Sequence, residues 1–446
     1  MASTKLSRTA GSTGNRRTWT WSGWVKRAAV PGTADAKGGL FSTYTDTNNR
    51  LDFGVDANHR FFFKEKESGS TVIDFTSTRL FRDPSAFYHF VIAVDTTDST
   101  AADRVKVYVN GERITSWLDS TAPSQNRDTL MNVSGRTYII GSTDGSSNYW
   151  NGLMSYVSFV DGTAYDASYF GETNAATGIW TITTSPSVTY GTNGFFLKMD
   201  TSSPGSDTSG NNNTYTASGT PTLAQDNASN NLATMNPLDN YYQGSIFSNG
   251  NNTFLTTDVS TTYNTSSIMV NTGKWYVECK VVSGSATTNI GIVGEMADAT
   301  TGQIKAKEFG YAYINNGEFG NNGSASSYGS SYANGDIIGI ALDCTNNKLY
   351  FSKNGTFQDS GNPSAGSGGK TITAVASTTL GLYTFAACDT SNGDVRTFSF
   401  NFGNGFFGTT AIASSNADAA GHGLFEYAVP TGYYTLNTKN LNTYGG

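Results

Sequence analysis

Charged residues are scarce in this sequence, and their scarcity narrows the kinds of partner that it can bind. Asp, Glu, Lys and Arg make up 14% of the 446 residues, and the formal net charge is −7. Binding to a phosphate backbone needs clustered Lys and Arg. We therefore do not expect nucleic acid to be a partner.

Cysteine is almost absent, and this argues against a disulfide framework or a zinc centre. The three cysteines are Cys279, Cys344 and Cys388. Their number is odd and their spacing is not that of metal ligands. We expect three small buried side chains in a protein made in a reducing cytosol.

Long apolar stretches are missing as well. No segment reaches the roughly 20 apolar residues that a membrane helix needs, so no membrane insertion is expected. The first residues, from Met1 to Arg8, contain no apolar run of the kind found in a secretory signal peptide.

Turn-forming and aromatic residues are abundant instead. The chain has 50 Gly, 26 Phe and 24 Tyr, and Ser, Thr and Asn are frequent. Turn formers with aromatics, few charges and no helical periodicity indicate an all-β protein with many short strands. A chain of this length is expected to hold two or three domains.

The charge pattern divides the chain into two parts. Residues 1–200 hold 19 basic and 19 acidic residues, whereas residues 201–446 hold 9 basic and 16 acidic residues. Arginine almost ends at Arg136, with only Arg396 after it. Residues 201–231 are rich in Ser, Gly, Asn and Thr, which predicts a linker or surface crossing. We therefore expect one domain over residues 1–200 and a second over residues 232–446.

The second part contains the most informative motif. Residues 335–355, GDIIGIALDCTNNKLYFSKNG, predict a buried strand, a turn, an alternating strand and an Asn-Gly hairpin turn. Residues 272–281, TGKWYVECKV, predict another strand, with Trp275 on its core face. Together these motifs resemble the SPRY domain, a family that binds partners and carries no chemistry of its own.

The first part resembles another sandwich family. Its blocks, in order, are WSGWVK at 21–26, FYHF at 87–90, KVYVNG at 106–111 and NGLMSYV at 151–157. This order resembles the laminin-G/concanavalin-A-like lectin fold. The expected fold class is thus all-β, with two tandem jelly-roll β-sandwiches.

Further blocks extend the resemblance to virion appendage proteins of tailed phages, notably marine ones. They are STGNRRTW at 12–19, LFRDPS at 80–85 and YGTNGFF at 190–196. This resemblance implies a non-enzymatic structural or adhesive protein of the virion: a tail fibre, spike or head decoration. Its partners would be host-surface glycan or other virion proteins, and the chain would form a homo-oligomer on a particle assembled in the host cytoplasm.

The alternative is a carbohydrate-active enzyme or its carbohydrate-binding module. Most glycosidases need two carboxylates at one bond, which on a strand means acids two or four residues apart. Glu65 and Glu67 share a face, but KEKESG predicts a solvated hairpin tip, and Glu278 stands alone. His89 lies in an apolar strand pattern that favours packing over catalysis. We therefore expect no enzyme activity.

Other candidate sites are weak. Asp207-Thr-Ser-Gly-Asn211, with Asp200 nearby, resembles a turn that sometimes holds calcium in laminin-G-like modules. Calcium needs six or more oxygen ligands, and a simple Asx-turn explains the pattern as well. No other cofactor is expected. Residues 365–371, AGSGGKT, imitate a phosphate loop but precede no helical pattern.

Aromatic residues in loops are the remaining binding candidates. They are Tyr241, Tyr242, Tyr328 and Tyr332. Their rings could stack on sugars or peptides, but tyrosine is also common at the edges of sandwich cores. The sequence alone does not decide which face binds.

Overall fold

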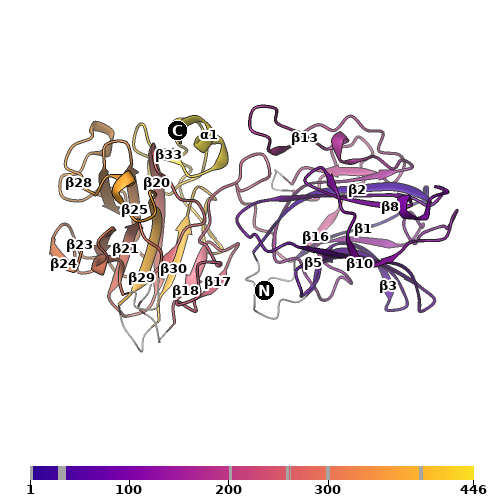
Figure 1. Cartoon of the computed structure of the whole chain (residues 1–446), viewed down its shortest axis with the longest axis horizontal. Coiled ribbons are helices and arrows are strands. Elements are labelled where there is room, and N and C mark those ends of the chain that lie inside the picture. Colours follow the sequence, from indigo (N-terminus) through magenta and orange to yellow (C-terminus); the bar gives the residue numbers. More distant parts are fainter. Residues whose placement is uncertain are drawn as a thin grey trace. The chain divides into compact units, whose positions relative to one another are not determined.

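Trp19 and Trp21 lie on strand β2 (Thr18–Arg27), in the first of two β-sandwiches. The computed structural model describes residues 4–28, 37–199, 203–257, 261, 263–297, 302–390 and 395–445. The chain divides into unit 1, residues 1–223 with 227–229, and unit 2, residues 224–226 with 230–446. In Figure 1, unit 1 runs from indigo to magenta and unit 2 from pink to yellow.

Unit 1 is built from two main sheets and a small hairpin. Its larger sheet contains β1 (Lys5–Thr9), β3 (Gly38–Asp46), β4 (Asn49–Val55), β5 (Arg60–Glu67), β6 (Ser70–Leu80), β10 (Trp117–Thr121), β11 (Thr137–Ile140) and β16 (Thr216–Ser218). Its second sheet contains β2, β7 (Tyr88–Asp95), β8 (Val105–Val109), β9 (Glu112–Arg113), β12 (Gly152–Asp161) and β15 (Phe195–Leu197). The hairpin is formed by β13 (Gly171–Thr173) and β14 (Trp180–Ile182).

The strand orders are those of a β-sandwich in which two sheets pack face to face. Over the described residues they are β10-β6-β5-β4-β3-β11-β1-β16 and β15-β12-β2-β7-β8-β9. The rings of Trp21 and Phe53 join the sheets edge to face, with centroids 5.0 Å apart. Trp19 meets Phe63 in the same way at 6.0 Å. These aromatic contacts form the core between the sheets.

In residues 18–22, Trp19 and Trp21 alternate with Thr and Ser, a pattern that predicts a half-buried strand. The outer face of β2 is nevertheless covered. Thr20 and Ser22 are buried, and the Thr20 hydroxyl donates to the carbonyl of Thr163. The segment after β12 packs Ala167 and Phe170 on this face. The alternation of residues identified the core face of β2 correctly. It carries no information about the segment after β12 that covers the other face.

Unit 2 has the same plan. Its larger sheet contains β17 (Ile246–Ser248), β18 (Thr253–Leu255), β20 (Lys274–Ser283), β25 (Ile337–Asp343), β26 (Lys348–Lys353), β27 (Thr356–Phe357), β28 (Lys370–Thr371), β30 (Thr397–Asn401) and β33 (Tyr434–Thr435). The facing sheet contains β19 (Asn264–Thr265), β21 (Thr288–Val293), β22 (Gly310–Ile314), β23 (Glu318–Asn321), β24 (Ser324–Ser327) and β29 (Thr384–Asp389). A small hairpin is formed by β31 (Phe406–Phe407) and β32 (Thr410–Ala411).

Helical structure is minor. The 3-10 turns are η1 (Ala101–Asp103), η2 (Ala167–Tyr169), η3 (Ile304–Ala306), η4 (Pro363–Ala365) and η5 (Val375–Ser377). Among the described residues the single α-helix is α1 (Thr438–Tyr444). No helix in this part of the chain is long and apolar enough to cross a membrane.

The hairpin expected from residues 335–355 is confirmed. Strands β25 and β26 pair antiparallel, with Ile340 opposite Phe351. After β26 the turn is made by Asn354 and Gly355, with φ of 46° and 82°, as a type I′ turn requires. Over the described residues the larger sheet has the order β17-β18-β30-β20-β25-β26-β27.

The boundary between the domains differs from the expected one. Strand β16 pairs with β1, placing Ser218 opposite Lys5, and Tyr215 is buried in the core of unit 1. Unit 1 therefore continues to Leu223, and much of the expected linker 201–231 completes the first sandwich.

Candidate recognition surface

The glutamates weighed for catalysis are structural groups. Glu65 is buried on β5, so the expected solvated hairpin tip is wrong for this residue, while Glu67 stays partly exposed. The backbone N–H of Leu130 donates to Glu65 Oε2 at 3.3 Å. Burial raises the pKa of Glu65 to about 7. A carboxyl group covered in this way is closed to a substrate.

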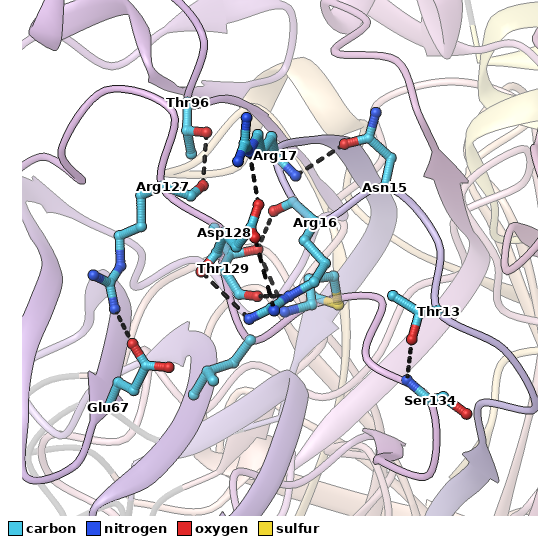
Figure 2. A network of polar contacts seen from close by, with 12 residues as sticks. Thr13, Asn15, Arg16, Arg17, Glu67, Thr96, Arg127, Asp128, Thr129 and Ser134 are labelled. Carbon is cyan, nitrogen blue, oxygen red and sulfur yellow. Dashed lines mark hydrogen bonds and ion pairs between the residues drawn. The ribbon is translucent and has the colours of Figure 1, made fainter.

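The charged residues around this covering segment form the network drawn in Figure 2. Arg17 Nε donates to Asp128 Oδ1 at 2.7 Å, and Arg127 pairs with Glu67. Arg16 Nε donates to the carbonyl of Thr129 at 2.8 Å. The network connects the residues before β2 to the segment between β10 and β11. These charged side chains therefore stabilise the fold of unit 1.

Glu278 has a comparable position in unit 2. Its side chain points away from Trp275, as the strand alternation predicts, but the C-terminal segment buries it completely. The backbone N–H groups of Glu426 and Tyr427 donate to its two oxygens at 3.0 and 2.8 Å, and Asn401 Nδ2 donates at 3.1 Å. Burial raises the pKa of Glu278 to about 7 against the effect of these donors. Glu278 therefore fixes the C-terminal segment over the sheet.

His89 is a packed side chain, as expected. It stacks on Trp24 with ring centroids 4.6 Å apart, and its Nδ1 accepts from Trp180 Nε1 at 3.0 Å. Burial lowers the pKa of His89 to about 3. The imidazole is therefore neutral and held between two indoles.

The three cysteines are buried thiols, also as expected. Cys279 and Cys344 pack in the core between the sheets of unit 2. Cys388 lies in a smaller cluster with Tyr263 and Val293. Burial raises the pKa of each thiol, so none of them is set up as a nucleophile.

The calcium candidates are placed in part. Asp200 lies outside the described residues. Asp207 accepts from the N–H groups of Phe196 and Asn213 at 2.9 and 2.7 Å, while Asn211 Nδ2 donates to the carbonyls of Gly191 and Gly194. Both side chains thus hold the turn after β15, and no group of three His, Cys, Asp or Glu among the described residues could hold a metal ion.

Two other sequence features take structural roles. The glycine-rich residues 365–371 form a turn that leads into strand β28, and no α-helix starts where the turn ends, as a phosphate loop would require. Tyr328 and Tyr332 are buried rather than exposed in loops. The Tyr332 hydroxyl donates to the carbonyl of Tyr313 at 2.9 Å, so these two rings belong to the core.

Tyr241 and Tyr242 remain as the exposed aromatic pair. Tyr241 is 88% exposed and Tyr242 is 42% exposed, and their rings meet edge to face at 5.0 Å. Leu238 and Ile246 beside them in sequence are 52% and 63% exposed. We call Leu238, Tyr241, Tyr242 and Ile246 the Tyr241 surface. Four exposed apolar residues within nine positions of the sequence, two of them in ring contact, make this loop a candidate interaction site.

Polar side chains inside the loop hold this surface in place. Asn240 accepts from the Ser245 N–H at 2.9 Å and donates to the Ser245 carbonyl at 2.8 Å. Gln243 Nε2 donates to the Tyr263 carbonyl at 2.6 Å. The Ser245 hydroxyl donates to Asn264 at 2.6 Å. The loop therefore presents its apolar side chains from a fixed backbone.

Sequence reasoning identified the tyrosine pair but missed Leu238 and Ile246. The available signal was the distribution of charge. No Lys or Arg occurs between Lys198 and Lys274, and Asp239 is the only charged residue from 236 to 248. Charge depletion around aromatic residues is characteristic of the centres of protein interfaces.

The protein therefore consists of two β-sandwiches in tandem. Its candidate binding surface, the Tyr241 surface, lies on the second unit. Residues 3–168 match the concanavalin A-like lectin/glucanases superfamily, and residues 274–401 match the SPRY domain. The chain thus contains a concanavalin-A-like domain followed by a SPRY domain, as the sequence motifs predicted.

Solved structures show weaker similarities. The SPRY domain of human HERC1 is 16% identical, with 35% of this chain and 92% of that chain covered and a TM-score of 0.27. A heptameric SAP-like pentraxin from Limulus polyphemus is 15% identical, with 36% and 77% covered and a TM-score of 0.25. Domain 4 of AbnA, a GH43 extracellular arabinanase from Geobacillus stearothermophilus in complex with arabinotriose, is 17% identical, with 34% and 64% covered and a TM-score of 0.24. Among curated proteins, none matches the chain.

Proposed function

We propose that this protein is a non-enzymatic structural or adhesive component of a phage virion, such as a tail fibre, spike or head decoration. Its partners are other virion proteins or host-surface glycan. The observation that carries the proposal is the Tyr241 surface. Tyr241 is 88% exposed, and the side chains of Asn240 and Gln243 hydrogen-bond the loop to the rest of unit 2. The virion setting rests on the sequence blocks at 12–19, 80–85 and 190–196.

The chemistry of the buried carboxyl groups supports a binding role over hydrolysis. A glycosidase needs two carboxyl groups that reach one glycosidic bond. Glu65 and Glu278 have the raised pKa values that a general acid needs, but each is covered by its own unit's chain. We therefore take binding, not turnover, as the function.

Particle composition tests the proposal. The protein should be found in particles purified through a density gradient, and antibodies against it should label one part of the virion in micrographs. Tyr241→Ala should reduce incorporation or adsorption of the protein, whereas Tyr169→Ala, which alters an exposed tyrosine of unit 1, should not. Absence from purified particles would refute the virion role.

An activity screen tests the enzymatic alternative. The purified protein should release no product from β-glucans, alginate, agar or host lipopolysaccharide. Reproducible turnover that disappears in Glu65→Gln or Glu278→Gln, while folding is retained, would establish an enzyme instead.

A further inference from the structure

We infer that residues 403–433 form a lid on the outer face of the larger sheet of unit 2. The lid opens as one segment while the sandwich stays folded, and Glu278 holds it closed. This device goes beyond the proposed function and does not depend on it. Three features support it: the path of the chain, the contacts of the lid, and the surroundings of Glu278.

The lid leaves the larger sheet and returns to it beside the same strand. Strand β30 pairs antiparallel with β20, placing Asn401 opposite Glu278. Strand β33 pairs parallel with the beginning of β20, placing Tyr434 opposite Trp275. In the described part of the chain, the two strands within the lid, β31 and β32, pair only with each other. The order of strands in the sandwich therefore does not depend on the lid.

The lid also adds nothing to the core between the two sheets. That core includes Phe402, just before the lid, and Leu436, just after it, but no residue from 403 to 433, a segment that the structure describes throughout. The lid packs instead on the outer face of the sheet. The apolar cluster there consists of Tyr276, Ala341, Tyr350, Phe425 and Tyr433. Opening the lid would break this cluster and leave the core intact, which is the condition for local rather than global unfolding.

Glycines with a positive φ lie at both ends of the lid. Gly403 follows β30 with a φ of 103°, and Gly432 lies just before β33 with a φ of 81°. Residues with a Cβ atom rarely adopt such a backbone. At Gly432 an added Cβ would have nothing within 4 Å, so an alanine there would strain the closed backbone without a clash. Glycines at these two points are suited to act as hinges.

Glu278 connects the lid to the sheet. The N–H groups of Glu426 and Tyr427 in the lid both donate to it, at 3.0 and 2.8 Å. Asn401 strengthens the attachment, since its Nδ2 donates to Glu278 at 3.1 Å and to the carbonyl of Leu424 at 2.9 Å. Glu278 is fully buried. Opening the lid would therefore remove the two backbone donors and return the carboxyl group to water.

Asp418 is a buried acidic residue of the lid with a different role. It accepts from the N–H of Thr435 at 2.8 Å and from Asn440 Nδ2 at 2.7 Å. Both partners follow the lid in the sequence. Asp418 therefore fixes the C-terminal end of the lid rather than its hold on the outer face of the sheet.

The groups around Glu278 leave burial as the main influence on it. The strands beside it have Gly339 and Asn401 at its level. Tyr276 and Tyr427 lie near it, and burial raises the pKa of both. The charged side chains on the surrounding elements have other contacts: Lys274 pairs with Asp343, Lys353 pairs with Asp336, Lys280 lies over the ring of Phe407, and Glu426 accepts from the Ala413 N–H.

The lid should open more readily as pH rises. Burial raises the pKa of Glu278 to about 7, against a usual value of 4.5. Between these values the closed lid holds a proton that the open lid has released. Opening therefore becomes more favourable from about pH 4.5 to about pH 7, and the lid is held most firmly in mild acid.

Hydrogen exchange of the full-length chain, followed by mass spectrometry, tests the lid. Backbone amides of residues 424–433 should exchange at least about tenfold faster than those of β20 and β25, because they exchange through local opening. The rate for residues 424–433, corrected for the intrinsic effect of pH on exchange, should rise at least about tenfold from about pH 5 to about pH 7.

Glu278→Gln tests the attachment. The amide cannot ionise, so residues 424–433 should exchange faster than in the wild type at about pH 5 and should lose their dependence on pH. Glu65→Gln is the matched control, because Glu65 is a buried carboxyl group of unit 1 whose pKa is also raised to about 7. It should leave the exchange of the lid unchanged.

Gly432→Ala tests the hinge without altering Glu278. Alanine is disfavoured at this φ, so exchange of residues 424–433 should rise at least about fivefold, while β20 and β25 keep their wild-type protection. Gly381→Ala is the matched control, because Gly381 lies outside the lid, with a φ of 64° and nothing within 4 Å of an added Cβ. It should leave the lid unchanged.

Two sets of outcomes contradict the inference. Equal protection of residues 424–433 and of β20, or equal acceleration of both by Gly432→Ala, would show that this segment unfolds only with the sandwich, and would overturn the lid. Exchange of the lid that does not depend on pH in the wild type, or a dependence that persists in Glu278→Gln, would overturn the role of Glu278.

Discussion

Trp275 is the residue on which the core of unit 2 depends most clearly. Its side chain is fully buried between the sheets, and its Nε1 donates to the Thr272 carbonyl at 2.8 Å. Trp275→Ala should lower the unfolding free energy by about 3–5 kcal/mol, because the truncation leaves a cavity. Tyr241→Ala, at an exposed position of the same unit, should change it by less than about 0.5 kcal/mol. Calorimetric melting of both variants checks the contrast, and equal melting temperatures would contradict it.

Glu278 should make unit 2 less stable as pH rises. The folded pKa is about 7, against a usual value of 4.5, so between these values the folded state holds a proton that the unfolded state has released. The unfolding free energy must then fall as pH increases from about 4.5 to about 7. A shift of this size corresponds to roughly 3 kcal/mol.

Urea unfolding of Glu278→Gln at several pH values checks this effect. The amide has no proton to lose, so the contribution of this group to the slope should disappear. At low pH the variant should be less stable by about 1–3 kcal/mol, because the amide nitrogen faces a backbone N–H donor. The gap between wild type and variant should narrow toward neutral pH. Glu112→Gln, an exposed control, should keep the wild-type slope, and an unchanged slope in Glu278→Gln would contradict the assignment.

The sequence predicted the position of a side chain correctly where the alternation of residues along one strand decides which face of the sheet it lies on. The faces of Trp19, Trp21 and Trp275 follow from alternation along a single strand. The burial of Glu65 and Glu278 does not follow from alternation, because the segments that cover them come from distant parts of the sequence. The Tyr241 surface was predicted only in part, since exposure of aliphatic residues depends on which chain segments fail to cover them.

Among the elements, β16 changes the limits of the first domain. It is three residues long, and its sequence Thr-Ala-Ser is exposed, so no strand pattern could distinguish it from a linker. Its partner β1 precedes it by more than 200 residues. The neighbouring Tyr215 packs on Phe195 with ring centroids 4.8 Å apart. A tertiary pairing, rather than local propensity, makes this segment a strand.

Two fragments of the first domain test the role of β16. The fragment 1–200 ends at the boundary that composition suggests, and the fragment 1–223 includes β16 and Tyr215. The longer fragment should melt at a clearly higher temperature, because the shorter one leaves the core site of Tyr215 empty. Circular dichroism melting curves of the two fragments give the comparison. Identical curves would show that residues after 200 add nothing to unit 1.

At the scale of the whole molecule, the two units should separate on limited proteolysis. The chain passes from one unit to the other between residues 223 and 230, and residues 216–220 just before are exposed. Trypsin has no site between Lys198 and Lys274, so a protease of broad specificity is required. Early cleavage near residues 219–225 should leave two folded β fragments, which mass spectrometry can identify. First cuts inside either sandwich would contradict this division.

Adhesion, where it occurs, should depend on the number of copies more than on charge. The basic residues of the chain are dispersed, and the Tyr241 surface is almost uncharged. Adsorption to host cells should therefore change by less than about threefold between roughly 0.05 and 0.5 M salt. Presentation of many copies on one particle should raise apparent affinity by about 10²–10⁴ over the monomer. Adsorption of the wild type across this range of salt, free in solution and coupled to beads at high density, measures both effects. A steep loss of adsorption with salt would instead reveal a charged binding site.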